Sequence, residues 1–145
     1  MTDTLTLEQA SRIAAQALAA GRDRGYAPLA VAVLDARGCL KAFLAEDGTS
    51  LLRADIAAAK ASGALGMGVG GRALQARAQH NPGFFHSLAA LSQGRMVPVP
   101  GSVLIRNGSG ALLGAVGISG DTADNDETCA VAGVQAAGLV ADAGQ

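Results

Sequence analysis

The chain has 145 residues, of which 50% are hydrophobic and 3% aromatic, and it contains no tryptophan. A chain of this length predicts a single domain, residues 1–145, that buries roughly two-thirds of the surface exposed by the unfolded chain. Its formal net charge of -1 provides no positive footprint for a nucleic acid or an anionic membrane, so neither is expected as a partner.

The sequence indicates neither a secretion signal nor a membrane span. Residues 1–8 lack the basic patch and the apolar stretch of a signal peptide. No run approaches the ~20 apolar residues that cross a bilayer. The two cysteines, Cys39 and Cys129, show no zinc-binding spacing, and two buried reduced thiols are expected. The expected location is the cytoplasm.

An amphipathic helix is predicted near the beginning of the chain. Thr6 and Gln9 have the spacing of an N-terminal capping pair, which satisfies the free N–H groups of a first turn. Apolar residues then recur at helical spacing until Gly21 or Gly25, where the helix is expected to end. The residues of this apolar face are Ala10, Ile13, Ala14, Ala17 and Leu18.

A hairpin and a second helix are predicted next. Residues 29–34 and 39–44 are typical of two strands joined by a tight turn. Thr49 or Ser50 can cap the following helix, which is expected to end near Gly66.

The middle of the chain, residues 66–100, has a less regular pattern. We expect a flexible loop over residues 66–71, a helix over residues 72–79 and a short helical turn from Asn81 to about Leu88. Connections of this length often line binding sites.

The last third predicts a second hairpin and a final helix. Residues 102–106 and 111–119 are typical of strands, and a helix is expected from about residue 123 to residue 141. Asp124 and Glu127 have the spacing of a capping box at its start. Strand pairs joined by tight turns and separated by helices indicate an α+β domain with an antiparallel sheet.

Three short motifs together resemble a known family. They are Leu34 to Gly38, Asp55 with Ala59-Lys60-Ala61, and Gly114 to Gly120 followed by Asn125-Asp126-Glu127. In this order they resemble the GlcG/HbpS-like family over about residues 7–141. This family is also called the haem-degrading or DUF336 family, and it is related to the carboxy-terminal domain of PduO-type proteins. The resemblance implies a profilin-like fold, with a five-stranded antiparallel sheet and packed helices, and a homo-oligomer. The small-residue faces expected to pack between subunits are Ala57, Ala58 and Ala61, and Ala132, Gly133 and Ala136.

The resemblance also implies a small-molecule ligand, with haem or a related tetrapyrrole in a pocket between the sheet and the middle segment. His80 and His86 are the only histidines, so they are the candidate cofactor and iron ligands, with Phe84 against the macrocycle. Six residues apart on a helix, they would lie ~120° from one another, so only one is expected to bind iron. Alternatively, His80 is a solvated helix end and His86 a subunit contact.

Ser119, Gly120 and Asp121 are further candidate cofactor-binding residues. The glycines around Ser119 could expose backbone N–H groups to a carboxylate or propionate where the last helix begins. The neighbouring acidic residues argue against an anion there, because they would repel it.

A second hypothesis is a small accessory enzyme that acts on an organic acid or carbonyl compound without haem. Lys60, drawn toward Asp35, Asp126 or Glu127, could serve as a Schiff-base amine or a polarising cation, which makes Lys60, Asp35 and Asp126 the candidate catalytic residues. The same lysine and a carboxylate could instead form an ion pair that orients two elements. Both hypotheses expect the end of the strand at residues 111–119, Lys60 and the histidine-containing segment to meet around a single concavity.

One departure from the family lies at the border of the expected pocket. Relatives commonly carry a double-glycine turn ending in proline before the strand at residues 102–106. Here Ser102 replaces a glycine and Leu104 replaces the proline. The loss of a glycine reduces the conformational freedom of the backbone there, and Ser102 adds a hydroxyl group. Both changes could alter which ligand fits the pocket.

Overall fold

The computed structural model describes residues 4–145, which form five helices and a five-stranded antiparallel sheet. The elements are α1 (Leu7–Asp23), β1 (Ala30–Asp35), β2 (Leu40–Ala45), α2 (Arg53–Met67), α3 (Gly71–His80), α4 (Pro82–Leu91), β3 (Ser102–Arg106), β4 (Leu112–Ser119), α5 (Ala123–Ala136) and β5 (Val140–Asp142). The predicted α+β fold with an antiparallel sheet is confirmed.

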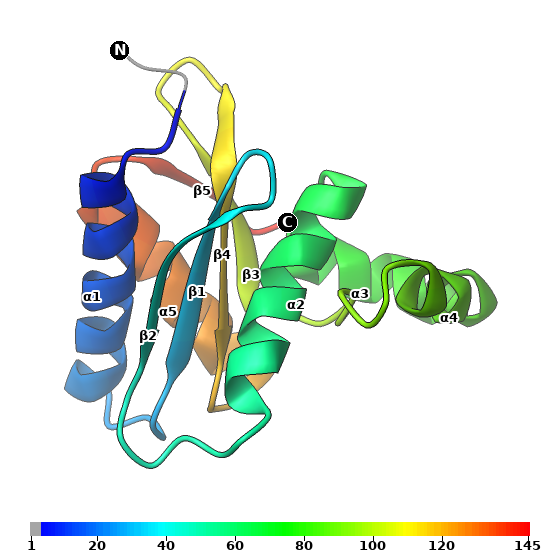
Figure 1. Ribbon diagram of the computed structural model, residues 1–145, viewed down its shortest axis with the longest axis horizontal. Helices are drawn as coiled ribbons and strands as arrows, with labels where there is room; N and C mark the ends of the chain where they lie inside the picture. The colour runs from blue at the N-terminus through cyan, green and yellow to red at the C-terminus, as the bar shows by residue number, and fades with distance from the viewer. Residues whose placement is uncertain (1–3) are drawn as a thin grey trace.

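The sheet lies between two unequal helical layers (Figure 1). Its strands follow the order β2-β1-β4-β3-β5. Helices α1 and α5 cover one face, and α2 covers the other. Helices α3 and α4 extend away from the sheet on the far side of α2. We refer to residues 71–91, which form α3 and α4, as the projection.

The main core fills the space between the sheet and the α1–α5 layer. Val31 and Val33 of β1 point to this face, where they join Ile13 of α1 and Cys129 of α5 in one buried cluster. The predicted Thr6 capping box is present, with both reciprocal hydrogen bonds formed. The apolar pattern of the first helix therefore predicted this packing correctly.

On the opposite face, α2 lies directly against the backbone of β4. A Cβ atom added to Gly117 would overlap the carbonyl oxygen of Ala57, so the glycine permits this close approach. Ala57 and Ala61 are fully buried by the contact, and Gly133 is buried between α5 and α1. These positions pack within the chain, so they were wrongly predicted as subunit contacts, and the homo-oligomer stays a prediction.

Two element boundaries were predicted incorrectly. The final helix ends at Ala136 instead of residue 141, because residues 140–142 form the edge strand β5 and satisfy the outer hydrogen-bonding groups of β3. Helix α2 begins at Arg53, and its N-cap residue Leu52 makes no side-chain capping bond, so neither Thr49 nor Ser50 caps it.

The remaining predictions for the middle segment are largely confirmed. Asn81 begins α4 by accepting a hydrogen bond from the Phe84 N–H, and the helix continues to Leu91.

Cys39 is exposed, contrary to expectation, whereas burial raises the pKa of the Cys129 thiol to about 11. Among residues 4–145, no helix combines the length and apolar character needed to cross a bilayer.

Candidate functional site

Lys60 lies in a buried polar cluster where α2, β4 and α5 meet. Its ammonium group donates hydrogen bonds to the Ile118 carbonyl oxygen, at 2.9 Å, and to Oδ2 of Asp126, at 3.2 Å. Only 3% of Lys60 and 1% of Asp126 is exposed. Burial lowers the pKa of Lys60 and raises that of Asp126, while the attraction between the two charges opposes both shifts.

The surroundings of Lys60 leave little room for a substrate. Gly101 has a φ of +119°, and a Cβ atom there would lie 2.6 Å from the Lys60 Nζ atom, so backbone closes over the ammonium group. Neither Lys60 nor Asp126 lines either cavity described below. The geometry fits the ion-pair interpretation, and a catalytic role for the two residues stays a prediction.

Asp35, the third candidate catalytic residue, is engaged at the β1–β2 turn. Its carboxylate accepts hydrogen bonds from the backbone N–H groups of Arg37 and Cys39 and from the Arg37 guanidinium, at 3.3 Å. Burial raises the pKa of Asp35, but these hydrogen bonds outweigh it and lower the pKa below its ordinary value. The structure therefore pairs Lys60 with Asp126, not with Asp35.

Ser119 and Gly120, at the end of β4, are both in contact with neighbouring protein groups. The buried Ser119 hydroxyl accepts a hydrogen bond from Nη1 of Arg53, at 3.1 Å. A Cβ atom at Gly120 would overlap the Pro28 carbonyl oxygen, because the β4 end packs closely against the start of β1. A ligand-binding role for this segment stays a prediction.

Asp121 connects the start of α5 to the segment before β1 through hydrogen bonds. Its carboxylate accepts hydrogen bonds from the Ala27 and Thr122 N–H groups and from the Asn125 amide. These bonds lower the pKa of Asp121 below its ordinary value. The Asp121 N–H donates to Oδ1 of Asp126, at 3.0 Å, so this backbone group already has a protein partner.

The capping box predicted for Asp124 and Glu127 is wrong. Thr122 caps α5 instead, by accepting a hydrogen bond from the Asn125 N–H. Asp124 and Glu127 bind the Arg72 guanidinium of α3, with N···O distances of 2.6 Å and 3.0 Å. This cluster raises the pKa of Arg72 and ties the projection to α5.

His80, the last residue of α3, lines a cavity of about 420 Å³ between the end of α2 and the projection. The other lining residues are Met67, Ala76, Arg77, Asn81, Phe84 and Phe85. Phe84 and Phe85 pack edge to face, with ring centroids 5.8 Å apart. One imidazole, one guanidinium and one thioether thus border a largely apolar hollow, which we call the His80 cavity. His86 is exposed on α4 and does not line it.

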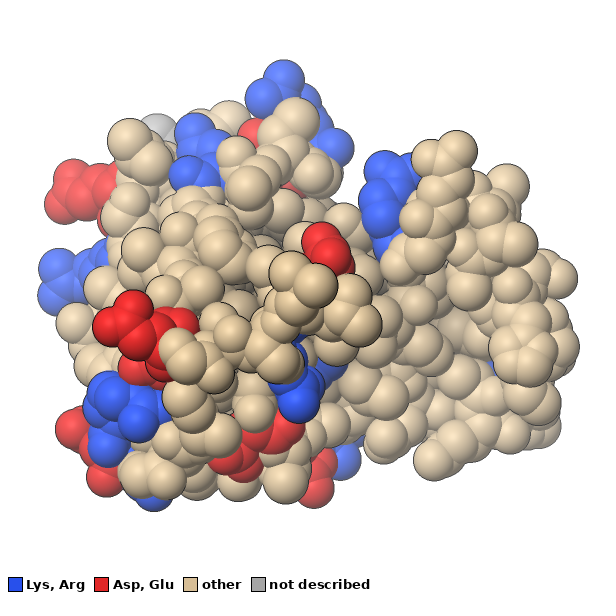
Figure 2. All heavy atoms as spheres, turned by 60° about the horizontal axis from the view of Figure 1, so that its bottom comes forward, with Lys and Arg blue, Asp and Glu red and all other residues tan. Residues whose placement is uncertain are grey.

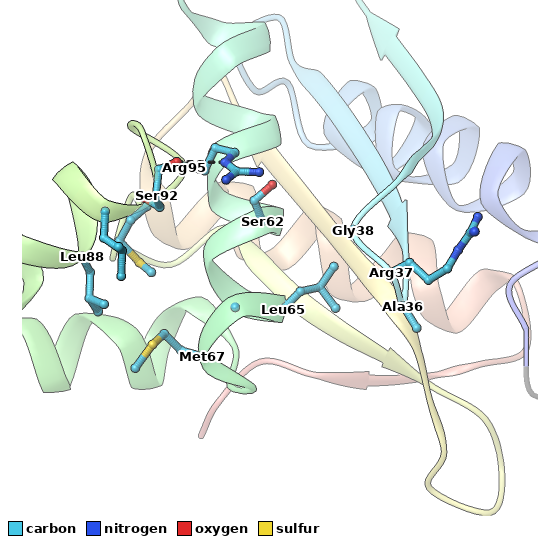
Figure 3. A pocket seen from close by; sticks show the side chains of 12 residues that line it. Ala36, Arg37, Gly38, Ser62, Leu65, Met67, Leu88, Ser92 and Arg95 are labelled. Carbon is cyan, nitrogen blue, oxygen red and sulfur yellow. Dashed lines mark hydrogen bonds between the residues drawn. The ribbon is translucent and has the colours of Figure 1, made fainter.

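A second cavity, also about 420 Å³, lies between α2, the β1–β2 turn and the chain that follows α4 (Figure 3). Leu65 and Leu88 contribute apolar surface, while Ser62 and Arg95 contribute polar groups. We call it the Arg95 cavity. Sequence reasoning missed it, because Ser62 and Arg95 lie on separate elements and belong to no motif. The apolar pattern of α4, which has no charged residue, was the one available signal.

The expected single concavity does not form. Lys60 meets the end of β4 through Ile118, but His80 and Phe84 line a hollow on the projection that none of the β4 residues reaches. Figure 2 shows that the surface of the projection carries few charged side chains, in contrast with the rest of that face. Among residues 4–145, no group of three or more His, Cys, Asp or Glu side chains could hold a metal ion.

Ser102, where the resemblance to the family predicts a glycine, is fully buried at the start of β3. Its hydroxyl has no hydrogen-bond partner among the described residues. It faces Gly71, where an added Cβ atom would lie 2.8 Å from the hydroxyl oxygen. Ser102 therefore contacts the base of α3 and lines neither cavity.

Comparison with known proteins identifies one matching family model and several similar folds. A family model described as haem degrading protein HbpS-like matches residues 5–135. None of the curated protein sequences matches the chain. The solved structure of a PduOC complex with haem has a TM-score of 0.84 and 22% identity, covering 98% of this chain and 99% of that chain.

Two further solved structures are similar over most of their length. The DUF336-family protein ORFY of Klebsiella pneumoniae has a TM-score of 0.85 and 22% identity, covering 95% of this chain and 93% of that chain. The structure of HbpS has a TM-score of 0.79 and 26% identity, covering 93% of this chain and 91% of that chain. The likeness to PduOC and ORFY shows a shared fold.

Proposed function

The chain belongs to the haem degrading protein HbpS-like family, and from that premise we propose that it binds haem or a related tetrapyrrole in the His80 cavity. The observation that carries the proposal is the position of His80 beside Phe84 and Arg77 around one apolar hollow. A tetrapyrrole needs an axial ligand for its metal, apolar surface for its macrocycle and a cation for its propionates. The lining residues supply all three.

Each lining residue has a distinct task in this proposal. The imidazole of His80 would hold the iron, because histidine is a common ligand of haem iron. Phe84, which is 47% exposed, would cover one face of the macrocycle, and Arg77 would bind a propionate. Met67 offers a thioether from the end of α2. Bound haem would supply an iron centre for electron transfer or oxygen chemistry.

The comparisons support this proposal without identifying the ligand of this chain. The family is described as haem-degrading, and PduOC was solved in complex with haem. The alternative of a Lys60-dependent enzyme has less support, because a carbonyl substrate would have to displace both Ile118 and Asp126 from the buried amine.

Titration of the full chain with haemin tests the proposal. We expect a Soret band that saturates at one haem per chain and changes in position in the His80→Ala variant, with affinity at least tenfold lower, because the axial ligand is lost. His86→Ala is the matched control and should bind as the wild type does, since His86 lies outside the cavity. Absence of a Soret change at micromolar haemin, or wild-type binding by His80→Ala, would refute the assignment.

A further inference from the structure

We propose that the Arg95 cavity is a separate site for a small apolar carboxylic acid, with Arg95 as the residue that binds the carboxylate. The cavity volume of about 420 Å³ lies within the roughly 300–1,000 Å³ that is usual for small-molecule sites. This site goes beyond tetrapyrrole binding, because neither Arg95 nor Ser62 lines the His80 cavity, and the two cavities share only Met67 among the described residues that line them.

The described part of the protein engages only one of the three nitrogens of the Arg95 guanidinium in a hydrogen bond. Its Nε atom donates a hydrogen bond to the Ser92 carbonyl oxygen, at 2.8 Å, which orients the planar group. Over residues 4–145, its two terminal nitrogens have no hydrogen-bond acceptor or ion-pair partner. These terminal nitrogens form one edge of the guanidinium fork, which matches the two oxygens of a carboxylate.

Arg37, the other arginine in the wall of the cavity, differs from Arg95 in its partners. The Arg37 guanidinium bonds the Asp35 carboxylate, and its side chain points away from the cavity (Figure 3). Ser62, by contrast, directs its hydroxyl toward the Arg95 guanidinium. Arg95 and Ser62 together therefore provide donors for a single anionic group, supplied by two different elements.

The remaining wall of the cavity provides apolar surface for the body of a ligand. Leu65, Met67, Leu88 and Met96 provide apolar surface, and no Asp or Glu among the described residues lines the cavity. The absence of a carboxylate there disfavours a cationic ligand, and the apolar wall disfavours a fully polar anion such as inorganic phosphate. A monocarboxylate with a hydrocarbon body satisfies both parts of the site.

Calorimetric titration of the full chain with sodium octanoate tests this inference. We expect one octanoate per chain, and affinity at least tenfold lower in Arg95→Gln, because the charge-assisted hydrogen bonds are lost. Arg37→Gln removes the same charge from a neighbouring residue of the wall whose side chain points away from the cavity, and it should retain wild-type affinity. 1-Octanol provides the apolar body without the charge, and its binding should be equal in wild type and Arg95→Gln.

Three results would overturn the inference. These are no octanoate binding at millimolar concentration, equal affinity in wild type and Arg95→Gln, and equal weakening by the two arginine variants, which would indicate diffuse charge attraction. Haemin titration of Arg95→Gln separates the two sites. Unchanged haemin binding supports a separate site, whereas its loss would make this cavity part of the tetrapyrrole site. Failure of haemin to bind the wild type would leave the octanoate result standing.

Discussion

Lys60 lies on α2, and Arg95 lies beside α2 in the segment between α4 and β3. Both side chains are cationic, yet their surroundings differ completely. Lys60 is 3% exposed and has both a carbonyl oxygen and a carboxylate as partners. Arg95 is exposed beside a cavity and makes one hydrogen bond, to a carbonyl oxygen of its own loop. A buried charge must be paired to be tolerated, whereas a solvated charge can remain available for a ligand. The contrast makes the His80 cavity and the Arg95 cavity the targets for functional experiments. It makes the buried Lys60–Asp126 pair the target for stability experiments.

The largest expected effect comes from breaking the buried pair. Lys60→Met leaves the Asp126 carboxylate buried without its counter-charge, so we expect a loss of ~3–5 kcal/mol in the free energy of unfolding, measured with urea. The double variant Lys60→Met/Asp126→Asn removes both charges and keeps an acceptor for the Asp121 N–H. It should recover a large part of the loss. A single-variant loss below ~1 kcal/mol would show that the Lys60–Asp126 pair contributes no more than a solvated surface pair, contrary to its burial.

The same glycine-to-alanine change should have opposite effects in the two regions. Gly117→Ala places a methyl group against the Ala57 carbonyl, so we expect a loss of ~1–3 kcal/mol as α2 is displaced from β4. Gly83→Ala lies in α4 with no atom within 4 Å of the added methyl group and should gain up to ~1 kcal/mol through helix propensity. Urea unfolding measures both changes. Equal effects would show that the helix–sheet contact is looser than the structure indicates.

The smallest effect concerns pH. Hydrogen bonds lower the pKa of Asp121 in the folded state, so its carboxylate stabilises the fold above the unfolded pKa, and that contribution is lost as pH falls below about 5. Asp121→Asn should therefore cost ~1 kcal/mol at pH 7 and lose less stability than the wild type on acidification.

Asp126→Asn should lose stability more steeply than the wild type as the pH falls, because the raised pKa of Asp126 favours the folded state at low pH. Unfolding curves between pH 3 and 7 measure both, and parallel profiles would contradict the assignment.

Much of the fold was predictable because its signals are local. The Thr6–Gln9 pair and the apolar spacing of the first helix depend on neighbouring residues alone, and both are confirmed. The edge strand β5 was missed because three residues after a helix carry no alternation, and only β3 gives them a partner. The Asp124–Glu127 spacing was misleading, because Arg72 of α3 competes for both carboxylates.

The candidate site was predictable to a smaller extent. Asp35, Asp126 and Glu127 were all predicted as possible partners of Lys60, and the packing of α2 against β4 brings Lys60 to Asp126, near the start of α5. His80 and Phe84, which were grouped by their closeness in sequence, line one cavity, and their role in binding a cofactor stays a prediction. Ser62 and Arg95 could not be grouped in advance, because the chain brings them together only when the α4–β3 connection folds back beside α2.

Residue order alone was therefore sufficient for the main helices, for four strands and for the resemblance to a family. It was not sufficient to say which charges would be buried and paired and which would face a hollow. That distinction depends on burial, and burial is set by contacts between segments far apart in sequence. Lys60 and Arg95 are both basic side chains, and their difference in partners arises from the close packing of α2 on the sheet and the exposed position of the segment between α4 and β3.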